Sequence, residues 1–308
     1  MGNLARFVGA ADSGPIQVRQ SGLKRDDVLE KRYVGMLVAA IIAIIVVYAR
    51  LFHPTWDYFP PDSLVNSLER SWIVIADVRD VAFFMYIVVA LGMMTLFFAL
   101  LQRRWALHAG TKGLLFGMSL GIIWAFGFLT GWAFFGTTLR AETLNVLIDF
   151  VGLSAGGYLV GMMVGQDLPQ APREIPKPRL AVVLVALGFV AAHSLGTAFL
   201  SDLLAETVDL LLRPGSSLQY GLLLGLGAWA GQMFVMLRHT LPLRNTMVRS
   251  AFFAFGVFGH SWILFNLFFV IEFSGVFATT LLTGLMGSVG IFFGIVAYEW
   301  TAGDMRSG

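Results

Sequence analysis

The sequence contains no cysteine among its 308 residues. This absence excludes disulfide bonds, thiolate metal sites, iron–sulfur clusters and cysteine nucleophiles. Charged residues are also scarce, at 13% of the chain, whereas a soluble domain carries about 25%. Residues 1–32 are polar and lack the apolar core of a signal peptide. We therefore expect the first apolar helix to be retained as a membrane anchor.

Motifs of soluble chemistry are missing as well. The chain has no Walker motif and no His-Glu-x-x-His pair, and these are the patterns that bind nucleotide phosphates or catalytic zinc. It also has no polar region large enough for an ATPase or kinase domain. Basic residues are scattered through short loops, so nucleic acid is not an expected partner. An enzyme is therefore not the favoured class.

Long apolar runs are what the sequence does contain. Hydrophobic residues make up 57% of the chain, and the mean hydropathy is +0.76. A helix crosses the ~30 Å hydrocarbon core with about 20 apolar residues. The runs predict an all-α protein of the lipid bilayer with eight spans, near residues 33–52, 81–102, 113–136, 143–165, 180–200, 218–237, 250–272 and 277–299.

The spans divide into two groups of four that resemble each other. Residues Gly121–Gly156 and Gly259–Gly294 share a glycine, tryptophan and Val-Gly skeleton at an offset of 138. Four spans per copy make the copies parallel, as in duplicated transporters. The predicted organisation is a tail (1–32), a first membrane repeat (33–166), a Pro-rich linker (167–179), a second repeat (180–300) and a C-terminal tail (301–308).

Basic residues predict the orientation of the eight spans. With the N-terminus inside, 16 of the 21 Lys and Arg residues lie on the cytoplasmic side, as the positive-inside rule requires. Both termini are then cytoplasmic, and the expected location is the cytoplasmic membrane of a bacterium or archaeon. The outer side holds the remaining five, Arg50, Arg70, Arg79, Arg140 and Arg213.

Polar and ionisable residues inside the spans are the best pointers to function, because charge in hydrocarbon is costly. Most of them fall in the outer half of the predicted membrane. A carboxylate at this depth could bind a cation or alternate its protonation during transport. The candidate pathway residues are Asp149, Asn145, His260, Asn266, Glu272 and His193.

Three functions remain open from the sequence. The leading hypothesis is a permease for a small solute or ion, with Asp149 as the cation- or proton-binding acid. The first alternative is a non-catalytic subunit of a larger membrane complex, or a homo-oligomer, associated with pigments or cofactors. The second is a membrane redox protein or enzyme, with haem held by His193 or His260, or a metal held by these two and Asp149.

Overall fold

The computed structural model describes residues 25–52, 68–105, 107–167, 175–200, 216–241, 243 and 245–302. Most of the two predicted tails and the middle of the predicted linker lie outside these residues. The described chain is almost entirely helical and forms no strand, only an isolated bridge between Arg70 and Phe273. The long helices are α1 (Arg25–Phe52), α3 (Arg79–Leu101), α4 (Ala109–Phe135), α5 (Leu139–Val164), α6 (Pro178–Leu200), α8 (Ser217–Leu237) and α12 (Phe277–Thr301).

Seven helical segments in the described chain are long and apolar enough to cross a membrane. They correspond to the second through the eighth predicted spans, so the chain is a multi-pass integral membrane protein. The first predicted span lies in α1, where a shorter apolar stretch covers Tyr33–Ala49. The seven segments are Arg79–Arg104, Ala109–Phe135, Leu139–Val164, Pro178–Phe199, Ser217–Leu237, Thr246–Glu272 and Phe277–Thr301.

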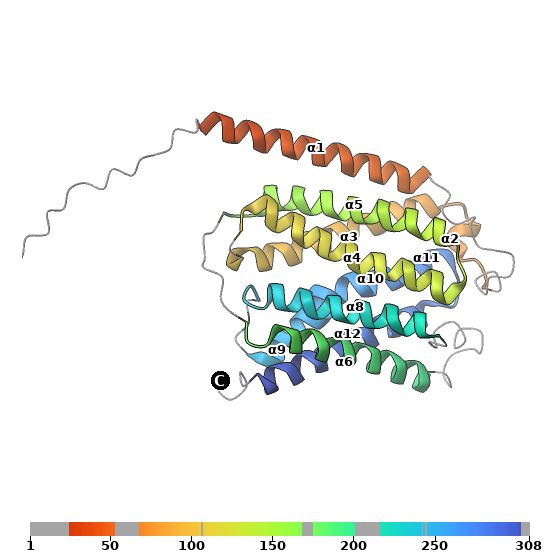
Figure 1. Cartoon of the computed structure of the whole chain (residues 1–308). Helices are drawn as coiled ribbons and strands as arrows, with labels where there is room; N and C mark the ends of the chain where they lie inside the picture. Colours follow the sequence, from red (N-terminus) through yellow and green to blue (C-terminus); the bar gives the residue numbers. More distant parts are fainter. Residues whose placement is uncertain are drawn as a thin grey trace, which may run out of the picture.

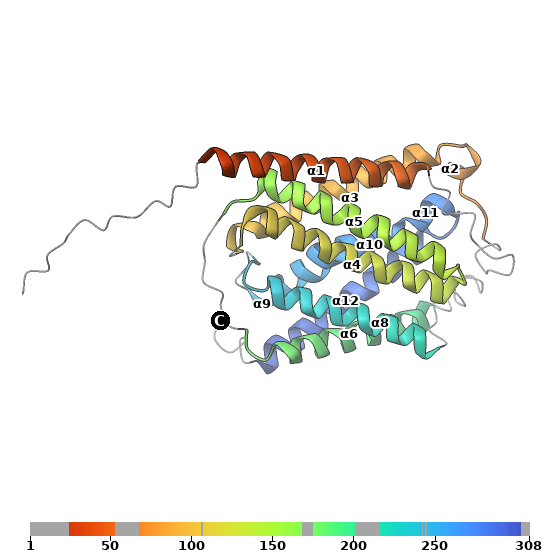
Figure 2. The same cartoon turned by 45° about the horizontal axis from the view of Figure 1, so that its top comes forward.

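The long helices run side by side in one bundle, with α1 along one edge and α6 and α12 at the opposite edge (Figures 1 and 2). Helix α4 packs on α5 and α8, and α6 packs on α8 and α12. We call one end of the bundle the basic end, because it carries Arg103, Arg104, Lys177 and Arg179. The other is the α2 end, after the short helix α2 (Trp72–Ile75).

Glycines allow α4 and α5 to pack with their backbones in contact. A Cβ on Gly157 would lie 2.4 Å from the carbonyl oxygen of Gly113, and one on Gly117 would lie 2.1 Å from that of Leu153. No larger residue fits at either position, so these glycines of α4 and α5 form a packing surface of the kind known between membrane helices. Helix α4 ends at Gly136, whose φ of +68° is the left-handed conformation that glycine adopts freely.

The seventh predicted span is a continuous but irregular helix. It consists of α9 (Thr246–Ala251), a π-helix (Phe252–Phe258), α10 (Gly259–Leu267) and α11 (Phe269–Glu272). A π-helix widens the turn and is often found at functional sites. Helix α10 lies inside the bundle, where it contacts α3, α4 and α12.

Candidate functional site

A cavity of about 80 Å³ lies between α4, α6, α8, α10, α11 and α12, and we call it the central cavity. Phenylalanines form much of its wall, among them Phe134, Phe265 and Phe269. Polar side chains interrupt this apolar wall on α4, α6, α10 and α12. They are Thr130, His193, Trp262, Asn266, Thr279, Thr280 and Thr283.

Four of these side chains donate hydrogen bonds to the backbone of their own helix. Thr130 Oγ1 donates to the Gly127 carbonyl at 2.7 Å, and Asn266 Nδ2 donates to the Trp262 carbonyl at 2.8 Å. On α12, Thr283 Oγ1 donates to Thr279 at 2.8 Å and Thr280 Oγ1 to Val276 at 3.0 Å. This back-bonding uses the single donor of each threonine and one of the two N–H donors of Asn266 inside an apolar bundle.

The central cavity is covered at the α2 end by a short segment of the first half of the chain. Leu68 lines the cavity beside Phe135, Phe273 and Val276. The residues after Leu68 pair with the segment that links α11 to α12, through the bridge between Arg70 and Phe273. We call this pairing of residues 69–71 with 272–274 the clasp.

The clasp is held by backbone and side-chain contacts together. Ser71 N donates to the Glu272 carbonyl at 2.9 Å, and Ser274 N donates to the Glu69 carbonyl at 2.9 Å. Arg70 Nη1 lies 3.5 Å from Glu272 Oε2, and its guanidinium lies over the Phe273 ring at 5.2 Å. Glu272 is fully buried, although it is the last residue of the seventh predicted span.

A second cavity, of about 220 Å³, lies between α1, α3, α4 and α5, and we call it the α1 cavity. Asp149 lines it among apolar and aromatic residues. Two aromatic residues of its wall have their polar atoms bound elsewhere. Tyr86 donates from its hydroxyl to the Leu264 carbonyl at 2.8 Å, and Trp124 Nε1 donates to Ser261 Oγ at 3.0 Å.

The six predicted pathway residues therefore lie in several places. His193 and Asn266 both line the central cavity. The sequence could not establish this, because it does not determine the rotation of each helix about its axis. Asp149 lines the α1 cavity. Asn145 lies one turn away on α5, where its Nδ2 donates to Glu142 Oε2 at 3.1 Å. Glu272 belongs to the clasp.

His260 is the second residue of α10 and lies directly after the π-helix. Its Nδ1 lies 2.6 Å from the Gly256 carbonyl, within the π-helix, and its ring stacks on Phe97 of α3 at 4.6 Å. His193 lies elsewhere, with its ring near Phe134 and Phe189. Among the residues that the structure describes, no three His, Asp or Glu side chains are grouped as a metal site. The metal site of His193, His260 and Asp149 is thus not assembled.

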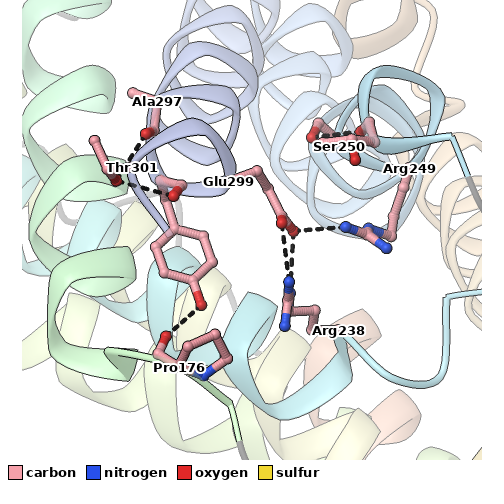
Figure 3. A network of polar contacts seen from close by, with 9 residues as sticks. Pro176, Arg238, Arg249, Ser250, Ala297, Glu299 and Thr301 are labelled. Carbon is pink, nitrogen blue, oxygen red and sulfur yellow. Dashed lines mark hydrogen bonds and ion pairs between the residues drawn. The ribbon is translucent and has the colours of Figure 1, made fainter. Parts of the chain in front are cut away.

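The sequence reasoning missed a buried charge cluster at the basic end (Figure 3). Glu299 of α12 is fully buried, and it accepts from Arg238 Nε at 3.0 Å and Nη2 at 2.9 Å. Arg249 Nη2 donates to the same carboxylate at 2.8 Å. The neighbouring Tyr298 hydroxyl donates to the Pro176 carbonyl at 2.5 Å. The signal in the sequence was an acid at the last position of an apolar span.

A second polar junction closes the basic end between α3, α4 and α5. Lys112 is fully buried, and its Nζ donates to the carbonyls of Gln102 at 3.0 Å and Gln166 at 2.8 Å. Both carbonyls lie at helix C-terminal ends, where a positive charge is favourable. Lys112 thus ties these three helices together.

Comparison with known proteins does not assign the chain to a family. No family model matches it, and neither a curated protein nor a solved structure matches it.

Proposed function

We propose that this protein is a permease that moves a small solute across the membrane through the central cavity. The observation that supports this most strongly is the cavity itself, which places seven polar side chains inside an apolar bundle. Cores that serve only structure are close-packed and avoid such groups. Helix α4 belongs to the first half of the chain and the other cavity helices to the second, so the cavity lies where the halves meet.

We further propose that the chain forms eight spans in two parallel repeats, with α1 as the first span. Equivalent glycines support this: Gly152 of α5 lies against Val46 of α1, and its counterpart Gly290 of α12 lies against Gly188 of α6. Trp124 and Trp262 are also counterparts. Trp124 donates to the side chain of Ser261. The residue equivalent to Ser261 is Ile123, whose side chain has no acceptor atom. This accounts for the buried Trp262 Nε1 without a partner.

In this proposal the basic end faces the cytoplasm, together with both termini. The Glu299 cluster and the Lys112 junction keep the basic end closed in the conformation described here. The clasp covers the central cavity on the opposite side. Opening of the clasp would admit a solute from outside, and separation of the basic end would release it inside, which is alternating access.

Asp149 remains our candidate for the acid that binds a proton or cation during transport. It lies in the α1 cavity, whose wall includes Trp124. Trp124 in turn contacts Phe265, a residue of the central cavity, with ring centroids 5.9 Å apart. Asp149→Asn should abolish solute accumulation in proteoliposomes while leaving the unfolding temperature unchanged. Unchanged accumulation would remove Asp149 from the mechanism.

The absence of cysteine permits a direct test of the permease. Arg70 and Phe273 face each other between flanking hydrogen bonds, as in a non-hydrogen-bonded antiparallel pair. Cα atoms of such pairs are about 4.5 Å apart, within the range of a disulfide. The double variant Arg70→Cys, Phe273→Cys should therefore form a disulfide that locks the clasp.

The measurement is uptake of a panel of labelled amines, amino acids, sugars and inorganic ions by proteoliposomes. At least one solute should enter with the native chain and with the reduced double variant. Oxidation should stop that uptake, and reductant should restore it. The single variants serve as controls and should not respond to oxidant. If no solute enters through the native chain, or if the locked chain transports at the native rate, the proposed function is wrong.

A further inference from the structure

Three of the seven polar side chains that line the central cavity share one hydrogen-bonding character. The hydroxyls of Thr130, Thr280 and Thr283 each donate their single proton to a carbonyl of their own helix. The oxygen of a hydroxyl that donates in this way retains its lone pairs as acceptors. Three threonines on two helices therefore offer oxygen acceptors to the cavity and no remaining donor.

Asn266 adds a fourth acceptor, its Oδ1, beside the second N–H of its amide, which remains a donor. Its side-chain nitrogen must be the atom that faces the Trp262 carbonyl, because a carbonyl can only accept a hydrogen bond. The amide oxygen Oδ1 is the other end of the group and is an acceptor. The indole N–H of Trp262 is not a donor among these acceptors, because it lies beside Gly287 of α12, one helical turn beyond Thr283. A Cβ on Gly287 would be 2.8 Å from Nε1.

The wall and the charge of the cavity favour the same kind of ligand. Aromatic faces attract cations through their π electrons, and Phe134, Phe135, Phe265, Phe269 and Phe273 line the cavity. Among the described residues that line it there is no Lys or Arg. The volume of about 80 Å³ is several times the roughly 10–15 Å³ that one water requires, so a ligand of a few heavy atoms fits.

We propose that the central cavity binds a small monovalent cation that donates hydrogen bonds, of the ammonium or short alkylammonium class. The N–H groups of such a cation donate to the threonine hydroxyl oxygens and Asn266 Oδ1, and its charge lies against the phenylalanine rings. This inference deepens the proposed function, because it names the substrate class of the same site.

The test is calorimetric binding of methylammonium chloride to the full chain in detergent, at constant ionic strength. Methylammonium should bind measurably. Tetramethylammonium has the charge but no N–H, and it should bind at least tenfold more weakly, since a hydrogen bond to a charged group contributes about 1.5–3 kcal/mol. Equal binding of tetramethylammonium or of K⁺, or tighter binding of neutral urea, would overturn the proposal.

Matched variants test whether methylammonium binds in the central cavity. Thr283→Val removes one acceptor and nearly preserves volume, and it should weaken methylammonium binding about tenfold or more. The control is Thr143→Val on α5, where an exposed threonine makes the same back-bond, to Leu139 at 2.7 Å. Thr143→Val should bind like the native chain. Equal affinity of the two variants, with both chains folded by their unfolding temperatures, would contradict the assignment.

Failure of the ligand class and failure of the permease give different results. If methylammonium binds but no solute enters proteoliposomes, the ligand class stands and the proposed function is wrong. If another solute enters under control of the clasp disulfide and methylammonium does not bind, the permease stands and the cation assignment is wrong.

Discussion

Glu299 is the residue whose surroundings differ most from what its place in the sequence indicates. It lies at the end of an apolar span, where an acid is expected to reach water, yet its side chain is fully buried between two arginines. The arginines come from the loop after α8 and from α9. Their approach to α12 depends on the tertiary fold. Sequence spacing alone therefore could not pair them with Glu299.

Glu299→Gln should destabilise the protein strongly. The substitution leaves Arg238 and Arg249 buried without their shared carboxylate, and breaking a buried ion pair costs about 3–5 kcal/mol. Arg249→Met should cost less, because the two-point contact of Arg238 with Glu299 survives. Unfolding midpoints in detergent measure both effects. The exposed Asp80→Asn is the control, and equal midpoints for the two cluster variants would contradict this ordering.

At the scale of helices, the glycine spacing indicated which helix packs closely on another, whereas the sequence did not indicate that the seventh span is irregular. Glycine recurs about every four residues in α5, at Gly152, Gly156 or Gly157, Gly161 and Gly165, a spacing that favours close helix packing. The structure shows α4 as the helix in contact with these glycines. The span boundaries also follow from the apolar runs: residues 218–237 are predicted and α8 covers Ser217–Leu237. In contrast, nothing in Phe252–Phe258 indicates a π-helix, since the run is apolar throughout. The π-helix packs against Phe97 of α3 and against α12, and these contacts are not visible in the sequence pattern.

Gly157→Ala should separate α4 from α5. The added Cβ would lie 2.4 Å from the Gly113 carbonyl oxygen and 2.7 Å from Gly117 Cα, and both are backbone atoms that cannot rotate away. Overpacking of this kind costs about 1–3 kcal/mol, so the unfolding temperature should fall clearly. Gly221→Ala on α8 is the matched control, because a Cβ there meets nothing within 4 Å. A fall of the same size in both variants would show that helix contact is not the cause.

At the scale of the whole molecule, the candidate site was only partly predictable. The rarity of polar groups in the spans drew attention to His193 and Asn266, which both line the central cavity although they are 73 residues apart in the numbering. The same criterion selected His260 and Asp149, which lie against other surfaces. The rotation of each helix about its axis decides these outcomes, and α3 to α5 are too uniformly apolar for the pattern to fix that rotation. The threonines of α12 were missed because back-bonded threonine is common in apolar helices.

The number of spans is the property of the whole molecule that most directly affects the proposed mechanism. If α1 crosses the membrane, the N-terminal tail lies on the side of the basic end. If α1 lies on the bilayer surface instead, only the seven later spans cross, and the tail lies on the side of the α2 end. The two arrangements therefore place the same tail in different compartments, which labelling of the cysteine-free chain can distinguish.

Single cysteines at Ser13 in the tail, Arg103 at the basic end and Ser217 at the α2 end provide the measurement. In intact cells, a membrane-impermeant maleimide should label Ser217→Cys and leave Arg103→Cys unlabelled, because the basic end is expected to be cytoplasmic. With eight spans, Ser13→Cys should also stay unlabelled until the membrane is permeabilised. Labelling of Ser13→Cys together with Ser217→Cys in intact cells would mean seven spans. Two parallel four-helix repeats would then be untenable, because the first copy would lack the counterpart of α6.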